Sequence, residues 1–412
     1  MSSNRTDAPS HPGRSHRTLV VGALLTALVA LGQISTSIYI PSMPSIVRDL
    51  ATTPEKVNLT LTGFLAGFAV CQLLFGPLSD RCGRRPTLIA GLGLYLCASL
   101  LCVFAASIQA LIVGRVLQGM AACAGPVLGR AIVRDVYGPD GTAKAMAMIG
   151  AALAVSPAIA PMVGGYLQVW FGWRAAFVFL TMTGVVVLAA TVWLLEESNP
   201  RAAHGHVDGP GLFAASMRLL TDRRYVGNTL AVACIFAGLM AFAAGGPFVF
   251  IDLLGLSPQH YGMLAVFTVT GYLAGTLLAG RLAGRMALDR LTLLGLVVAA
   301  AGGFAMLLAA AVMEPSVVAV VAPMALFAAG LGIVLPTGIA AAMAPFPAIA
   351  GSASALLGFL QMLVAAGASA AVGLLSHNSA LPMAMVIAGG AALALLAFIL
   401  LVPHPRLGHP AG

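Results

Sequence analysis

The chain contains twelve apolar runs, and each is long enough to cross a lipid bilayer. Gly, Pro or charged residues bound the runs, which fall near residues 18–40, 58–78, 87–106, 110–133, 144–166, 175–195, 226–251, 260–283, 290–312, 318–340, 351–375 and 382–402. A crossing takes roughly 20 apolar residues and must be helical, because hydrocarbon offers backbone groups no partners. Only 8% of the residues are charged, against about a quarter in soluble domains. The sequence therefore predicts an all-α membrane protein with twelve transmembrane helices.

Lysine and arginine are distributed unevenly between the two ends of these predicted helices. Of the 21 such residues, only Arg48, Lys56 and Arg174 fall at one end and Arg115 falls within a run, while the rest fall at the other end. Basic residues collect in cytoplasmic loops. We therefore expect both termini, 1–17 and 403–412, to be cytoplasmic tails of a multi-pass inner-membrane protein. This distribution explains the net charge of +8 without nucleic acid as a partner.

A polar interruption halfway along the chain divides the runs into two sets of six. The segment that begins at Gly76 recurs weakly 204 residues later from Gly280, and Gly67 maps onto Gly271 at the same offset. Repeated halves around a central site are a transporter architecture. We expect an N-terminal six-helix bundle over 18–195, a cytoplasmic linker over 196–225 and a C-terminal six-helix bundle over 226–402.

The loop after the second run places an acid among arginines and glycines. It reads Gly76-Pro77-Leu78-Ser79-Asp80-Arg81-Cys82-Gly83-Arg84-Arg85-Pro86. At a helix end, a carboxylate can accept hydrogen bonds from backbone N–H groups or pair with arginine. The positive-inside rule alone explains the arginines but neither Asp80 nor the glycines. We predict a role in conformational gating for Gly76, Asp80, Arg81, Gly83, Arg84 and Arg85.

Arg115 is the one charged residue in the middle of a predicted helix. An arginine there costs roughly 2.5–3.5 kcal/mol on insertion scales, so it should face a cavity or a partner. Gln118 follows at i+3 and Gly119 at i+4, on the same face of the helix. We predict that Arg115 faces the central cavity and that Arg115 and Gln118 act in transport or coupling. The alternative is a structural arginine that binds carbonyl groups of a neighbouring helix.

The fifth run carries two prolines one turn apart, Pro157 and Pro161, and continues with Gly164 and Gly165. Proline removes a backbone hydrogen bond and glycine lets helices approach closely. We predict a bend at a moving interface between the halves, with static kinks as the alternative.

Polar and aromatic side chains inside the runs are the candidates for a substrate cavity. Taken singly, an aromatic residue is more often part of the core than a ligand contact, but together they fit a large apolar pocket with few polar groups. The candidates are Gln33, Thr36, Ser37, Tyr39, Phe64, Phe68, Phe242 and Gln361.

No cofactor, metal site or catalytic group is expected. The six cysteines stand singly without a CxxC pair, and the eight histidines fall in tails or predicted loops. No GxxxxGK[ST] loop is present, and no nucleophile–histidine pair can form within the membrane. The sequence therefore argues against an enzyme, and an ion channel or an ATP-driven pump is an unfavoured alternative.

Several motifs together resemble a known family. The G-x-L-x-D-R-x-G-R-R loop is similar to the signature loop of the major facilitator superfamily. The segments Arg115–Gly119 and Pro157–Gly165 resemble its second and third motifs, of which the third is found in exporters. The resemblance narrows to the Bcr/CflA (bicyclomycin/chloramphenicol resistance) drug-efflux branch at Tyr39-Ile-Pro41-Ser-Met-Pro44, Arg130-Ala-Ile-Val-Arg134-Asp135, Gly172-Trp173-Arg174 and Gly358-Phe-Leu-Gln361.

This resemblance implies a monomeric secondary-active exporter that moves small apolar drugs out of the cell in exchange for protons, by alternating access. A metabolite or nutrient permease of the same superfamily is the alternative. The chain departs from the branch at Ser37, where an acid is typical. Asp252, at the outer end of the seventh run, is then the acid nearest to a span and the candidate for proton coupling, with a solvated loop acid as the alternative. Because only Arg115 is charged at mid-depth, we expect neutral or anionic substrates.

Overall fold

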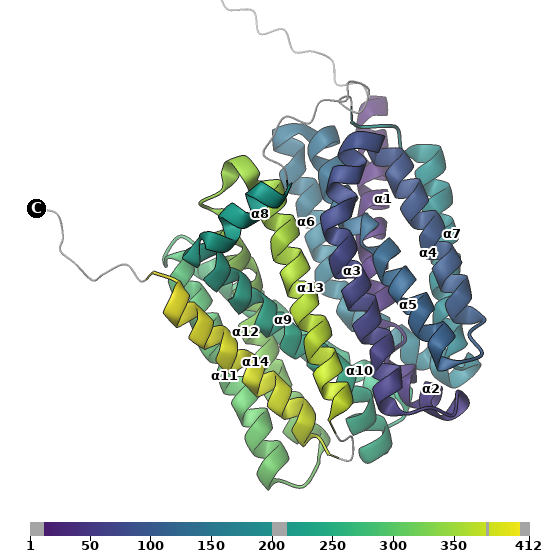
Figure 1. Ribbon diagram of the computed structural model, residues 1–412, viewed down its shortest axis with the longest axis vertical. Helices are drawn as coiled ribbons and strands as arrows, with labels where there is room; N and C mark the ends of the chain where they lie inside the picture. Colours follow the sequence, from purple (N-terminus) through teal and green to yellow (C-terminus); the bar gives the residue numbers. More distant parts are fainter. Residues whose placement is uncertain (1–11, 200–211, 376–378, 404–412) are drawn as a thin grey trace, which may run out of the picture.

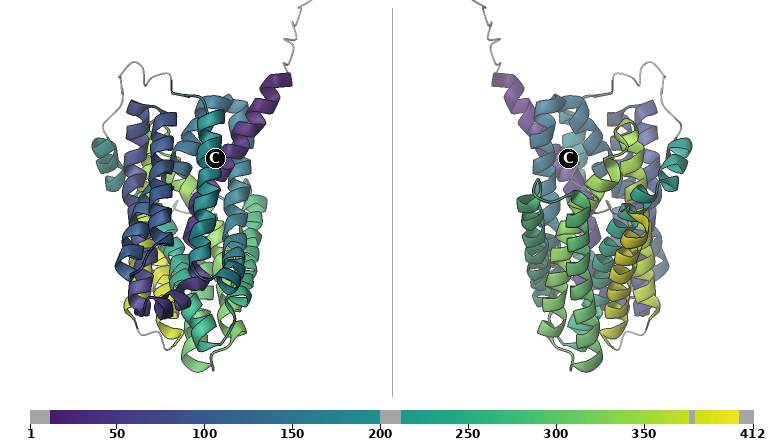
Figure 2. Two further views of the ribbon diagram at one scale, coloured as in Figure 1. Left: turned by 90° about the vertical axis from the view of Figure 1, so that its right-hand side faces the viewer. Right: turned by 90° about the vertical axis from the view of Figure 1, so that its left-hand side faces the viewer.

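The computed structural model describes residues 12–199, 212–375 and 379–403. Within these ranges twelve helices are long and apolar enough to cross a membrane, as the sequence predicts (Figure 1). The described residues contain no named strand, only one isolated bridge between Ala283 and Met286. The predicted tails 1–17 and 403–412 lie largely outside the described residues. Figure 2 shows that the spans run side by side along the long axis of the molecule.

The spans before residue 199 lie on one side of the molecule in Figure 1. The first span joins α1 and α2 through a short 3-10 turn, and the fourth joins α5 to the start of α6, whose later part forms the fifth. These elements are α1 (Pro12–Ser37), η1 (Ile40–Ser42), α2 (Met43–Asp49), α3 (Pro54–Cys82), α4 (Arg84–Val103), α5 (Ile108–Ala122), α6 (Ala124–Phe171) and α7 (Arg174–Leu194).

The spans after residue 212 lie on the other side. The seventh continues from α9 into a π-helical turn, η3. The elements are α8 (Leu212–Thr221), α9 (Arg223–Pro247), η3 (Phe248–Leu253), α10 (Pro258–Leu282), α11 (Leu288–Val312), α12 (Val317–Met343), η4 (Pro347–Ile349), α13 (Ala350–Leu374) and α14 (Leu381–Leu401). Between the two sides α3 packs on α13 and α6 packs on α10. The predicted domain boundaries, and their movement as separate bodies, stay predictions.

Local sequence explains where several helices begin and end. Ser107, Asp222 and Ser257 precede helices, and each side chain accepts a hydrogen bond from a backbone N–H of the first turn. Gly83 and Gly172 end α3 and α6 with φ of 95° and 80°, a region that disfavours other residues. The predicted linker also contains an amphipathic helix, α8, which the sequence analysis did not anticipate.

The two ends of the helix bundle differ in charge. The end that carries the Gly76–Pro86 loop, Arg134 and α8 is called the basic end below. The end that carries Arg48 and Asp252 is called the opposite end. The assignment of the basic end to the cytoplasm stays a prediction.

Candidate functional site

At the opposite end, the backbones of α6 and α10 touch. A Cβ atom added to Gly165 would lie 2.8 Å from the Cα of Gln259, and one added to Gly262 would lie 2.9 Å from the Cα of Met162. Real Cβ atoms essentially never approach other atoms within 3.0 Å. Glycine at both positions therefore lets the two sides of the molecule close against each other.

The proline and glycine segment of the fifth run lies at this contact. The carbonyl oxygen of Pro161 faces Gly262, while Gly164 lies against the backbone of Ile38, the residue that follows α1. The helix α6 continues without interruption past Pro157. That the segment bends or moves stays a prediction.

An ion pair joins the two sides at the same end. The Nη1 atom of Arg48 in α2 lies 3.4 Å from an Oδ1 atom of Asp252 in η3, and their side chains are 61% and 45% exposed. Residues 48 and 252 are 204 positions apart, the offset of the sequence repeat. Their spans, Val20–Asp49 and Arg223–Leu253, correspond at nearly the same offset. Asp252 is thus an ion-pair partner in this conformation, and its role in proton coupling stays a prediction.

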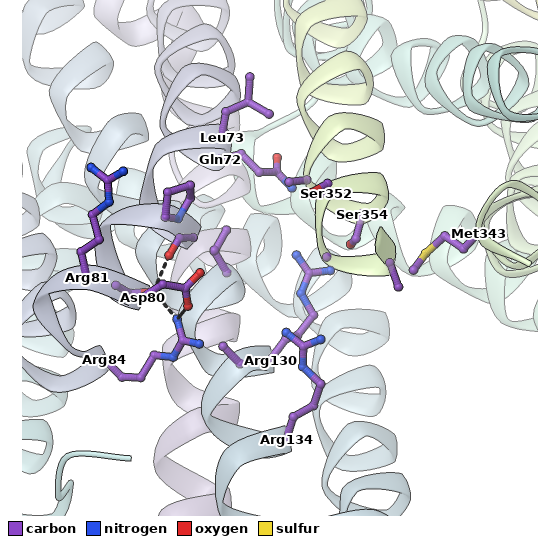
Figure 3. Close-up of a pocket in the computed structure, with 18 of the residues that line it drawn as sticks. Gln72, Leu73, Asp80, Arg81, Arg84, Arg130, Arg134, Met343, Ser352 and Ser354 are labelled. Atoms are coloured by element: carbon purple, nitrogen blue, oxygen red, sulfur yellow. Dashed lines mark hydrogen bonds and ion pairs between the residues drawn. The ribbon is translucent and has the colours of Figure 1, made fainter. Parts of the chain in front are cut away.

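At the basic end, a cavity of about 560 Å³ opens between the two sides (Figure 3). Helices α3 and α6 with the first residue of α4 form one wall, and the end of α12 with the start of α13 forms the other. The charged residues of the lining all come from the first wall: Asp80, Arg81, Arg84, Arg130 and Arg134. The molecule is therefore open at its basic end and closed at its opposite end.

The Gly76–Pro86 loop forms one rim of this cavity. Arg84 pairs with Asp80 at 2.6 Å and with Asp135 of α6 at 3.2 Å, so one guanidinium joins the end of α3 to α6. The Nη2 atom of Arg85 donates to the carbonyl of Val192. The Asp80 side chain is 47% exposed and lines the cavity beside Arg84 (Figure 3). The predicted gating residues thus lie together, and gating itself stays a prediction.

Two residues that the sequence analysis did not single out fix this loop. The Glu197 carboxylate accepts hydrogen bonds from the backbone N–H groups of Arg84 and Arg85, at 2.9 and 3.0 Å. The Asn199 side chain donates to the carbonyl of Asp80 at 3.0 Å. Partial burial raises the pKa of Glu197, but the backbone N–H donors outweigh it and hold the pKa below its usual value. More than a hundred residues separate these partners, so no local motif could have revealed them.

Arg115 does not line this 560 Å³ cavity, and its predicted role facing a central cavity stays a prediction. Its side chain is fully buried inside the first set of helices. The Nη1 atom donates to the carbonyl of Ser35 at 3.0 Å and to Gln118 at 2.6 Å. Gln118 in turn donates to Ser99 of α4. The guanidinium thus binds a carbonyl group of a neighbouring helix, as the alternative interpretation held.

Aromatic rings occupy the faces of this guanidinium. The Cζ atom of Arg115 lies 4.2 Å from the ring centres of both Tyr39 and Phe64, and 5.9 Å from that of Phe177. A cation between ring faces gains electrostatic attraction when it is removed from water. The Nε and Nη2 groups have no hydrogen-bond partner among the described residues. Cation–π contacts therefore replace a carboxylate at this site.

The eight candidate cavity residues lie away from the 560 Å³ cavity. Tyr39 and Phe64 stack on Arg115, and Phe68 packs beside Phe64 with 6.3 Å between ring centres. The Thr36 hydroxyl bonds to its own helix at Gly32. Among the others, Ser37 is buried and the remaining three are half-buried: Gln33, Phe242 and Gln361. None of the eight lines this cavity, and their contact with a substrate stays a prediction.

The part of the chain that the structure describes contains no cluster of three His, Cys, Asp or Glu residues able to hold a metal ion.

Comparison with known proteins gives a consistent set of similarities. The sequence model of the Major Facilitator Superfamily matches residues 23–369. The chain is 32% identical to an uncharacterized MFS-type transporter, YdgK, of Bacillus subtilis, with 94% of this chain and 96% of that protein covered. It is 31% identical to Multidrug resistance protein D of Escherichia coli, with 82% and 84% covered.

Two further similarities concern a drug-resistance protein and a fold. The chain is 24% identical to a bicyclomycin resistance protein homolog of Haemophilus influenzae, with 93% of this chain and 96% of that protein covered. Among solved structures, the crystal structure of a D-xylose–proton symporter superposes with a TM-score of 0.77 at 17% identity. The superposition covers 93% of this chain and 98% of the symporter chain.

Proposed function

Because this chain belongs to the major facilitator superfamily, we propose that it exports small drug-like molecules by alternating access. Its relatives include a bicyclomycin resistance protein homolog and Multidrug resistance protein D, as the Bcr/CflA resemblance implies. Protons moving in the opposite direction supply the energy. The protein works as a monomer in the inner membrane, with both termini in the cytoplasm. No enzymatic reaction is part of this proposal.

The observation that carries the proposal is the asymmetry of the two ends. A cavity of about 560 Å³ is open at the basic end. At the opposite end, glycines bring α6 and α10 into backbone contact and Arg48 pairs with Asp252. Alternating access requires one state of this kind and a second state with the ends reversed. If the basic end is cytoplasmic, as the positive-inside rule implies, this is the state that takes up drug from the cytoplasm.

The Gly76–Pro86 loop supplies the gate at the basic end. The start of α13 lies across the cavity from Asp80, and its first turn carries no acidic residue and no side-chain cap. An exposed helix start attracts a carboxylate. Closure of the basic end would bring Asp80 toward this helix start, while Arg84 holds it at the end of α3 in the open state. Asp80 thereby contributes to two alternative states, which is what a switch requires.

Proton coupling is assigned to Asp252. Arg48 competes with a proton for this carboxylate while the opposite end is closed. Opening of that end separates the two sides and frees the carboxylate to exchange a proton with the outside. This order of events links proton uptake to the state that releases drug.

The experiment is a susceptibility screen followed by direct transport. A strain that lacks its own efflux pumps and expresses this chain is tested against a compound panel that includes chloramphenicol, a sulfonamide and a quaternary ammonium dye. We expect resistance to neutral or anionic compounds and energy-dependent accumulation of the same compounds in everted vesicles. Accumulation of a nutrient by intact cells, with no change in susceptibility, would instead establish a permease.

A further inference from the structure

The cavity at the basic end has far more positive than negative charge. Four arginines and one acid line it, and the acid, Asp80, is already paired with Arg84. The second acid nearby, Asp135, pairs with the same arginine. Both of these carboxylates therefore pair with Arg84, and the lining contains no further acid beside Arg130 and Arg134 among the side chains that the structure describes.

Arg130 and Arg134 lie one turn apart on α6 and line the same cavity. The Nε of Arg130 donates to the carbonyl of Pro126 at 2.8 Å, which holds its side chain along the helix. Arg134 makes no hydrogen bond or ion pair with the residues whose side chains the structure describes. In Figure 3 both side chains point toward the end of α13 that carries Ser352 and Ser354. Two like charges at i and i+4 repel each other, so an anion bound beside both would offset their repulsion.

The opposite wall supplies hydrogen-bond donors without a competing charge. It consists of Met343 and the first residues of α13, including Ser352 and Ser354. Ile349 precedes this helix and provides no side-chain cap, so its first N–H groups lack that partner. The walls therefore present guanidinium groups on one side and N–H and O–H groups on the other.

Positive-inside topology does not account for this arrangement. The rule requires basic residues near this end of the helices, but exposed positions at helix ends satisfy it equally well, as Arg281 and Arg290 do. It gives no reason for two arginines to line a cavity. A cleft with low-dielectric walls and one sign of charge concentrates ions of the other sign.

We propose that Arg130, Arg134 and the start of α13 form a subsite for an anionic group, a carboxylate, sulfonate or phosphate, on the transported molecule. This inference rests on the proposed export function and adds the substrate class. Arginine suits the task because its planar fork matches such groups. The apolar body of the molecule would contact Leu73, Val127 and Met146, which line the same cavity.

A matched pair of probes tests the subsite by binding alone. Naphthalene-1-sulfonate and naphthalene-1-sulfonamide share one shape and differ in charge. Their dissociation constants follow from the concentration dependence of thermal unfolding of the purified full chain in uncharged detergent. We expect the sulfonate to bind at least about tenfold more tightly, which corresponds to about 1.4 kcal/mol.

Substitutions assign that preference to the two arginines. In Arg130→Gln and Arg134→Gln the preference should fall by about tenfold, and Arg134→Lys should keep part of it. Arg290→Gln changes the net charge equally, at the same end but outside the cavity, and should leave the preference unchanged. Equal affinity of the two probes for the unsubstituted protein, or a preference that survives both Gln substitutions together, would overturn the inference.

Two further arms distinguish the source of the anion. Nanodiscs of phosphatidylcholine with and without phosphatidylglycerol test a lipid headgroup, and inorganic phosphate tests a free ion. Arg134-dependent stabilisation by phosphatidylglycerol or by phosphate, without any by the sulfonate, would overturn the assignment to a transported molecule. Chloramphenicol is uncharged, so its export by the unsubstituted protein is measured separately. Export of chloramphenicol by a protein that binds the two naphthalene probes equally refutes the subsite and leaves the exporter intact. Failure of every compound to be exported, with the preference retained, refutes the exporter instead.

Discussion

Gly262→Ala should weaken the closed opposite end without weakening the fold. The added Cβ would lie 2.9 Å from the Cα of Met162 in α6 and closer still to the Pro161 carbonyl oxygen. Ordinary van der Waals contacts begin at 3.4 Å. The helix α10 must therefore move away from α6 until the added Cβ is at least that far from the Met162 Cα. These atoms meet only while the two sides are closed against each other. The substitution therefore penalises one conformational state.

The shift in population caused by Gly262→Ala depends on the cost of overpacking and on the higher helix propensity of alanine. Overpacking of a close contact costs about 1–3 kcal/mol. Alanine gains about 1 kcal/mol over glycine in a helix, but both conformational states contain this helix, so the gain cancels between them. The population closed at the opposite end should fall about 5- to 150-fold relative to the open one.

Cysteine labelling measures that population. In a background without the six natural cysteines, Gln259→Cys places a thiol at the contact between α6 and α10. Gly262→Ala should raise its rate of reaction with a maleimide in nanodiscs at least about fivefold.

Two glycines of the same helix provide matched controls. A Cβ at Gly280 meets nothing within 4 Å, so Gly280→Ala should leave the labelling rate unchanged. A Cβ at Gly275 meets Ala329 within the same half, so Gly275→Ala should lower the midpoint of thermal unfolding without a selective rise in labelling. Equal labelling rates in Gly262→Ala and Gly280→Ala would refute the argument.

Substitutions at four other residues test the remaining assignments. Asp80→Asn should keep normal abundance on immunoblots yet lose export, and full export would remove Asp80 from the switch. Arg115→Ala should abolish export and Arg115→Lys should be partial at best, because lysine lacks the planar fork; an active alanine variant contradicts this. In vesicles with a pH-sensitive dye, Asp252→Asn should lose substrate-dependent proton movement, and persistence excludes Asp252. The Glu197 carboxylate should stabilise the protein relative to Glu197→Gln above its usual pKa of 4.5 and lose that advantage as pH falls through its depressed pKa, which thermal unfolding across pH values measures.

The sequence predicted the spans well because lipid imposes a simple rule on every crossing. The run expected over 290–312 is the helix Leu288–Val312, and the run over 382–402 is Leu381–Leu401. It also predicted which loop would hold Asp80 near arginine, because Asp80 and Arg84 are only four positions apart along the chain. Short-range chemistry is visible in a sequence.

Contacts across the bundle were not predictable in the same way. The cost of a charge within a span shows that Arg115 needs partners, but aromatic rings and a carbonyl meet that need as well as a water-filled cavity does. Glu197 and the start of α4 are joined only by the folded chain. Which face of a helix meets the cavity depends on how all the other helices pack, and hydropathy does not encode that.

The Arg48–Asp252 pair bears on how a duplicated chain can close. Residues at equivalent positions of two identical halves would carry the same side chain, so an ancestral duplicate would have set two arginines or two aspartates against each other. Attraction at this point of the molecule became possible only after the halves diverged in sequence. A chimera built from two copies of residues 18–195 should accordingly bring one Arg48 against another and resist closure at that end, even if every helix inserts correctly.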